Sequence, residues 1–230
     1  MRALHALALA LSAGLSIASA PWALGQPWLN FVFKPLATVL IIAFAWPRGR
    51  GTPTARRWVL AGLVLSLAGD VALLWPRQGF VPGLLSFLLA HLAYLVAFTR
   101  AQPLAARRWP FVAYALLAGV VLATSLWSGV PAPLRTPVLA YVACLVAMAA
   151  QAAVVWRARP ADPAGRRLAL GGALFLLSDA LLAANRFALV LPLASLWILA
   201  PYWTAQVCIA SWLAPPSPAN EGSSPAAGGR

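Results

Sequence analysis

The sequence predicts an all-α protein, a polytopic bundle of eight transmembrane helices. Hydrophobic residues make up 62% of the 230 residues and charged residues only 9%. Long uncharged runs recur, and the breaks between them carry Pro, Gly or Arg, as in "PRGRGTPTARR" and "RARPADPAGRR". Each run holds roughly 16 to 22 residues, which is enough for a helix to cross a hydrocarbon core. A membrane β-barrel is excluded because it would show shorter, alternating segments.

The apolar runs define one domain over residues 1–213. We expect the spans near residues 3–20, 30–46, 58–75, 80–99, 110–127, 137–156, 168–187 and 193–213. The first run has a basic start and an A-x-A ending, so a cleaved signal peptide is an alternative interpretation. Pro21 directly after that cleavage site argues against it. Residues 214–230 have the composition of a disordered tail.

The arginines predict the orientation. Eleven lie in the second, fourth and sixth loops, against three at the odd loops. Because cytoplasmic loops carry the excess of positive charge, those even loops and both termini are predicted to be cytoplasmic. The net charge of +13 therefore reflects topology. Nucleic-acid binding is excluded, since no soluble face carries a basic stripe with interleaved aromatics.

Ionisable residues inside the predicted spans are the candidates for function, because each costs a few kcal/mol at the bilayer centre. "LSLAGDVALLW" holds Asp70 and "LFLLSDALLAANRF" holds Asp179, two of only four acidic residues. The whole polar set is Lys34, Asp70, His91, Asp179, Asn185, Arg186, Tyr202 and Gln206. From the predicted depths, we expect these groups to form a pocket that reaches inward from the non-cytoplasmic side. No metal site is expected, because the sequence has no CxxC motif and its two histidines are far apart.

Asp70 and Asp179 are predicted to be the catalytic pair. One carboxyl would stay protonated as a general acid, and the other would stay ionised and stabilise positive charge or activate water. Arg186, seven residues after Asp179, is expected to hold Asp179 ionised, which favours Asp70 as the acid. A basic residue at the pocket mouth would suit a phosphate headgroup, and Lys34 is the candidate. A purely structural alternative pairs Lys34 and Arg186 with the two aspartates to lock the bundle.

Five short motifs, in order and at compatible spacing, resemble the YhhN-like lysoplasmalogenases. They are "FKPL" (33–36), "GDVALL" (69–74), "FVPGLLSFLLAHLAY" (80–94), "LFLLSDALLA" (174–183) and "YWTAQ" (202–206). The resemblance, to a family of bacteria and animals, implies an eight-helix membrane enzyme without a cofactor. We expect this chain to lie in the inner (cell) membrane of a bacterium. The resemblance implies hydrolysis of the vinyl ether bond of lysoplasmalogens to a fatty aldehyde and glycerophosphoethanolamine or glycerophosphocholine. It also assigns the aspartate pair to Asp70 and Asp179, and substrate contacts to Lys34, His91, Tyr202 and Gln206.

A proton-coupled transporter of a lipid or small molecule is the main rival prediction. "LAGLVLSLAGDVALL" and "LALGGALFLLSDALLA" align on Asp70 and Asp179, with Gly62 opposite Gly171. Parallel repeats with intramembrane carboxylates are typical of transporters. However, no predicted span is broken at mid-membrane. A sensor or structural membrane protein is the third alternative. The sequence carries no signal for the oligomeric state.

Overall fold

The fold is an all-helical bundle, seen here in a computed structural model that describes residues 3–216. These residues form eight α-helices and no strand. The helices are α1 (Ala3–Ala18), α2 (Pro27–Ala45), α3 (Pro53–Ala72), α4 (Phe80–Thr99), α5 (Trp109–Val121), α6 (Ala132–Ala158), α7 (Pro163–Phe187) and α8 (Ala194–Trp212). The predicted fold class is confirmed. The predicted tail lies outside the described residues from residue 217 onwards.

Five of these helical segments are long and apolar enough to cross a membrane: α2, α4, α6, α7 and the segment Trp109–Gly129 that begins with α5. The other three helices pack in the same bundle. Helix α1 has 16 residues, α3 carries Arg56, Arg57 and Asp70, and α8 carries several polar side chains. The chain is therefore an integral membrane protein whose more polar helices pack beside more apolar ones.

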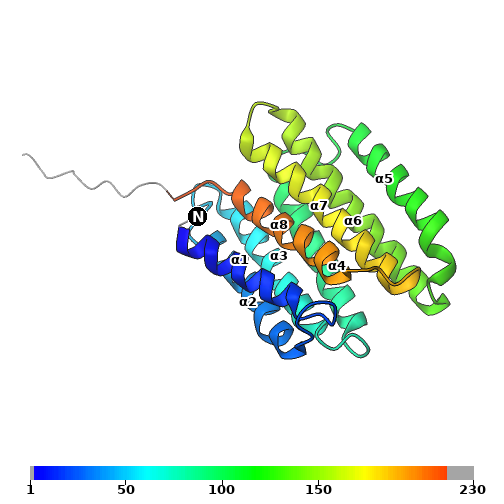
Figure 1. Cartoon of the computed structure of the whole chain (residues 1–230). Coiled ribbons are helices and arrows are strands. Elements are labelled where there is room, and N and C mark those ends of the chain that lie inside the picture. Colours follow the sequence, from blue (N-terminus) through cyan, green and yellow to red (C-terminus); the bar gives the residue numbers. More distant parts are fainter. Residues whose placement is uncertain (1–2, 217–230) are drawn as a thin grey trace, which may run out of the picture.

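Helix α6 lies in the centre of the bundle, and its neighbour α5 lies at the periphery. In α6, 67% of the most apolar window is buried, against 6% in the segment that contains α5. Figure 1 shows α5 at one edge of the molecule, beside α6, with α1 and α2 at the far edge. The structure therefore has a packed centre of α3, α4 and α6–α8, and α5 is a peripheral wall.

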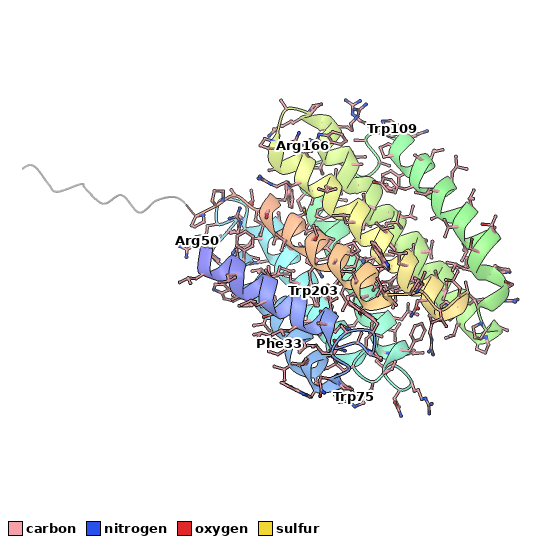
Figure 2. The ribbon with its side chains drawn as sticks, viewed as in Figure 1. Phe33, Arg50, Trp75, Trp109, Arg166 and Trp203 are labelled. Carbon is pink, nitrogen blue, oxygen red and sulfur yellow. The ribbon has the colours of Figure 1, made fainter. Side chains whose placement is uncertain are left out.

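The ends of the bundle differ in charge, as the arginine pattern predicted. The loop after α2 meets the end of α8, where the Gly49 N–H donates to the Ala214 carbonyl and Arg48 Nε donates to the Leu213 carbonyl. Figure 2 shows Arg50, Arg166 and Trp109 toward one end of the bundle and Trp75 at the opposite end. We call these the arginine-rich end and the opposite end.

Several helices differ in length from the predicted spans. Both α6 and α7 begin five residues earlier than predicted, each with proline in its first turn, a position where the missing N–H of proline is harmless. The run near 110–127 is α-helical only to Val121 and continues as a π-helical turn (η1, Leu122–Leu126) and a 3₁₀ turn (η2, Trp127–Gly129). Helix α3 ends at Ala72 rather than at residue 75 as predicted, so Asp70 lies in its last turn.

Glycine residues allow α3 and α7, the helices that carry the two aspartates, to pack closely against the helix that follows each of them in the chain. A Cβ atom added at Gly62 of α3 would stand 2.3 Å from the Tyr94 ring of α4. One added at Gly171 of α7 would stand 3.1 Å from the Ala205 carbonyl oxygen of α8. Each glycine precedes its aspartate by eight residues, so α3–α4 and α7–α8 are packed through corresponding positions.

Candidate functional site

A polar cavity of about 330 Å³ lies between α2, α3, α4, α7 and α8, toward the opposite end of the bundle. Six of the eight residues predicted from the sequence line it: Lys34, Asp70, Asp179, Asn185, Arg186 and Tyr202. The other two, His91 and Gln206, are fully buried behind the lining. The structure therefore gathers residues from helices that are far apart in the sequence around one space.

Asp70 is the most enclosed polar group of the cavity, with a side chain only 1% exposed. Its Oδ2 accepts hydrogen bonds from Thr38 Oγ1 at 2.6 Å and from the Tyr202 hydroxyl at 2.7 Å. Lys34 Nζ lies 3.7 Å from its Oδ1. An ammonium group and two hydroxyl donors are the partners that stabilise an ionised carboxylate.

A second layer of polar side chains holds these partners in place. The Tyr94 hydroxyl donates to Gln206 Oε1 at 2.6 Å, and Gln206 Nε2 donates to the Tyr202 hydroxyl oxygen at 3.3 Å. Trp203 Nε1 donates to Thr38 Oγ1 at 3.3 Å. Because each donor to Asp70 is itself fixed, the orientation of that carboxylate is determined by α2, α4 and α8 together. Gln206 thus acts through Tyr202.

Asp179 has a different environment. Its Oδ2 accepts a hydrogen bond of 2.5 Å from the Tyr141 hydroxyl of α6, and its side chain is 11% exposed. His91 Nε2 lies 3.8 Å from the same oxygen, which is beyond hydrogen-bonding distance. Among the described residues, no lysine or arginine forms an ion pair with Asp179.

His91 is enclosed by aromatic rings. The Phe175 ring lies edge-on to the imidazole with the centroids 4.6 Å apart, and the Tyr141 ring lies 5.3 Å away. Within the described residues, neither ring nitrogen has a hydrogen-bond partner. His91 therefore does not line the cavity. It fills the space between Asp179 and the aromatic core.

The predicted pairing of Arg186 with Asp179 is wrong for the described residues. The guanidinium lies over the Phe80 ring, 4.9 Å from its centroid, at the exposed rim of the cavity. Residues seven apart on a helix are two turns apart, and here Arg186 points toward α4 instead. Asn185 accepts a hydrogen bond from the Leu191 N–H through its Oδ1 at 2.9 Å, so this side chain also shapes the turn after α7.

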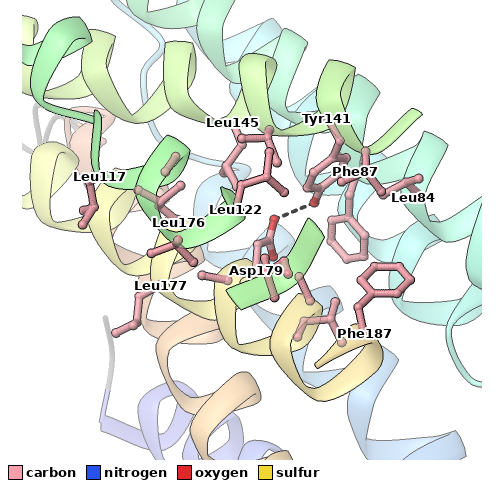
Figure 3. A pocket seen from close by; sticks show the side chains of 18 of the residues that line it. Leu84, Phe87, Leu117, Leu122, Tyr141, Leu145, Leu176, Leu177, Asp179 and Phe187 are labelled. Atoms are coloured by element: carbon pink, nitrogen blue, oxygen red, sulfur yellow. Dashed lines mark hydrogen bonds between the residues drawn. The ribbon is translucent and has the colours of Figure 1, made fainter. Parts of the chain in front are cut away.

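A second, apolar cavity meets the first at Asp179. It measures about 570 Å³ and lies between α4, α5, α6 and α7, with Asp179, Phe80, Phe87, Leu73 and Leu182 common to both linings. Figure 3 shows Asp179 and Tyr141 joined by their hydrogen bond, with Leu84, Leu122, Leu145 and Leu176 around them. Asp179 therefore stands where a polar space and an apolar space join.

Sequence reasoning missed three residues that contact the aspartates or their partners: Thr38, Tyr141 and Trp203. Thr38 lies four residues after Lys34 and therefore on the same face of α2, a spacing that could have identified it. Tyr141 lies in a run whose other residues are mostly apolar, and only the fold places it against Asp179.

The region of the chain that is similar to known proteins includes the whole candidate site. A profile of the YhhN family matches residues 29–213, which include all eight predicted site residues. The chain belongs to the YhhN family. The match begins in α2 and ends after α8, as the resemblance of the five motifs implied.

The proteins similar to this chain include some named lysoplasmalogenases and some named YhhN membrane proteins. The human protein named "Lysoplasmalogenase TMEM86A" is 35% identical over 190 residues, 80% of this chain and 77% of that protein. Human "Lysoplasmalogenase TMEM86B" is 34% identical over 187 residues, 79% of this chain and 74% of its own length. The "Uncharacterized membrane protein YhhN" of Escherichia coli O157:H7 is 32% identical over 158 residues, 69% of this chain and 74% of that protein. No solved structure matches the chain.

Proposed function

We propose that this membrane protein is a lysoplasmalogenase, which hydrolyses the vinyl ether bond of a lysoplasmalogen. The products are a fatty aldehyde and glycerophosphoethanolamine or glycerophosphocholine. One observation carries the proposal: two enclosed carboxylates from different helices line a single cavity, in a chain whose relatives are named lysoplasmalogenases. The catalytic unit in this proposal is the helical domain, residues 1–213.

The environments of the two aspartates favour opposite roles. Asp70 faces Lys34 and accepts two hydroxyl hydrogen bonds, so we assign it as the ionised carboxylate. Asp179 borders an apolar space and lacks an ion pair with lysine or arginine among the described residues, so we assign it as the general acid. This is the reverse of the sequence-based assignment, which rested on an ion pair between Arg186 and Asp179.

The chemistry follows from these roles. Asp179 donates its proton to the vinyl ether carbon distal to oxygen, and the double-bond electrons form the new C–H bond. The resulting oxocarbenium ion is stabilised by the Asp70 carboxylate. Water adds to the cationic carbon and loses a proton to Asp179, which restores the acid. The hemiacetal hydroxyl then loses its proton as its oxygen forms the aldehyde C=O bond, the C–O bond to glycerol breaks, and the departing glycerol oxygen takes up a proton to become the hydroxyl of the product.

The exposed rim of the cavity suits the phosphate headgroup. Arg186 is exposed there and Asn185 lies beside it, and arginine can bind phosphate oxygens through two N–H groups at once. Lys34 is buried against Asp70. We therefore assign the phosphate to Arg186 rather than Lys34, and keep Lys34 as the counterion of Asp70.

The orientation of the site follows from the arginine distribution. The cavity lies at the opposite end of the bundle, away from the eleven loop arginines. With those arginines and both termini on the cytoplasmic side, the site opens toward the non-cytoplasmic side of a bacterial inner membrane. Reporter fusions in the loop 47–52 and in the loop 188–193 test this, and a cytoplasmic signal from the second loop would contradict it.

The test of function is aldehyde release from a lysoplasmalogen by the purified protein in detergent or vesicles. We expect turnover by the wild type and a loss of about 10²-fold or more in Asp70→Asn and Asp179→Asn, since general acid–base catalysis contributes about that much. A single-chain ester phospholipid serves as the comparison substrate. Asp162→Asn is the matched control, because Asp162 caps the start of α7 at the arginine-rich end.

Either negative outcome has a clear meaning. A folded wild type that releases no aldehyde contradicts the proposal and favours the proton-coupled transporter, which would instead show proton-dependent uptake into vesicles. Turnover that persists in folded Asp70→Asn and in folded Asp179→Asn would contradict the catalytic pair, while the proposed hydrolase activity would stand.

A further inference from the structure

The apolar cavity extends well beyond the carboxylates. On α7 its lining runs from Phe187 to Ala173, which is about 21 Å along a helix at 1.5 Å per residue. Only three of its lining side chains carry a polar group, Tyr114, Tyr141 and Asp179. An elongated apolar space with a reactive carboxyl, Asp179, in its wall has the shape and chemistry of a site for one hydrocarbon chain.

The cavity is closed at the opposite end of the bundle. Leu126 and Val130 of the turns after α5 are buried. At Gly129, a Cβ atom would stand 1.7 Å from the Phe187 carbonyl oxygen, so only glycine allows this segment to lie against the end of α7. A lipid chain therefore cannot pass through this end without moving the turns.

The side between α5 and α7 is open by contrast. Helix α5 packs on α6 and continues into η1, and η1 rather than α5 makes the contacts with α7. Two residues that line the cavity from the two sides, Leu117 of α5 and Leu177 of α7, are 57% and 48% exposed. In a membrane, that exposure is to lipid.

We propose that the cavity holds the single hydrocarbon chain of the substrate, that the chain enters sideways from the bilayer between α5 and α7, and that the small side chain of Ala118 on α5 leaves room for a long chain. The proposal rests on the proposed function for the reacting bond. With the chain in the apolar cavity, the vinyl ether lies at Asp179 and the headgroup lies in the polar cavity beyond it. The two cavities share Asp179 in the order that such a substrate requires.

Length selection in this cavity is steric. Lipid tails are as apolar as the cavity lining, so moving a methylene from bilayer to protein gains little hydrophobic free energy. What distinguishes chains is whether they fit, since a close-packed wall tolerates little extra volume. Ala118 lies one turn along α5 from Leu122, away from the closed end, where a larger side chain would fill the passage.

Ala118→Phe and Ala115→Phe make a matched pair on one helix. Ala118 lines the cavity, whereas Ala115 is exposed on α5 outside the lining. With lysoplasmalogens of short and long chain, we expect Ala118→Phe to lower kcat/KM for the long chain at least tenfold relative to the short chain. Ala115→Phe keeps the wild-type ratio. Equal ratios in both variants would overturn this role of Ala118.

A photoreactive, saturated ether lysophospholipid tests occupancy without turnover. Its diazirine stands at the chain end, and vesicles containing the protein are irradiated before peptide mapping. We expect labelling of α5 and of residues 173–177, lost in Ala118→Phe and kept in Ala115→Phe. Labelling confined to α1 and α2 would overturn the chain site. Labelling in the cavity without aldehyde release would instead contradict only the proposed function.

Discussion

Lys34 and Asp70 form an ion pair between α2 and α3, with Nζ and Oδ1 3.7 Å apart and both side chains buried. The sequence offered two interpretations of this pair, a structural lock and half of an active site. In the structure the pair meets both descriptions, because it joins two helices and faces the polar cavity. Substitutions can separate the two roles.

Removing the lysine alone leaves a buried carboxylate without its cation. We expect Lys34→Met to lower the free energy of unfolding by about 3–5 kcal/mol, the usual cost of breaking a buried pair. The double variant Lys34→Met/Asp70→Asn should recover much of that loss. Thermal unfolding of the four proteins in detergent measures it. Additive losses in the double variant would show that the two side chains do not interact.

The hydroxyl of Tyr141 positions Asp179 without itself lining the polar cavity. We expect Tyr141→Phe to lower kcat about tenfold to a hundredfold, because a hydrogen bond to the charged carboxylate that Asp179 becomes on donating its proton contributes roughly 1.5–3 kcal/mol. Tyr114→Phe is the matched control, since the Tyr114 side chain lines the same apolar cavity. A similar fall in both variants would point to altered packing of the cavity instead of the contact with Asp179.

Arg186 is assigned to the substrate phosphate. We therefore expect Arg186→Gln to raise KM severalfold or more with kcat nearly unchanged, since binding away from the reacting bond contributes equally to ground and transition states. Arg77→Gln, in the neighbouring loop but outside the cavity lining, is the control. A fall in kcat with constant KM would contradict the assignment and restore a role for Arg186 near the chemistry.

Gly62 allows α3 to approach α4 closely. We expect Gly62→Ala to destabilise the protein by about 1–3 kcal/mol through overpacking, because the new Cβ atom would stand 2.3 Å from the Tyr94 ring. Moving that ring also disturbs the Tyr94–Gln206 hydrogen bond. At Gly119 of α5 no atom lies within 4 Å of the added Cβ, so Gly119→Ala should be neutral or stabilising. Unfolding in detergent compares the two, and equal stabilities would contradict the close packing.

The sequence by itself determined the helical class, because only helices satisfy backbone hydrogen bonds in apolar runs of these lengths. The arginine asymmetry also indicated which loops share one end of the bundle. Asp70, Asp179 and Lys34 are isolated ionisable residues inside apolar runs, where a charge is costly unless it has a partner or a function. All three line one cavity. These results depend on local composition, which the chain carries without its fold.

Only the tertiary structure decided how those residues pair. Spacing along α7 suggested Arg186 as the partner of Asp179, but the side chain lies over Phe80 of α4. Tyr141, 38 residues away in the sequence, is the group that contacts Asp179. The lateral opening beside α5 likewise exists because α5 and α7 both pack on α6, and η1 rather than α5 makes the contacts with α7. Such contacts depend on how helices distant in sequence are brought together, and a local sequence pattern does not specify that arrangement.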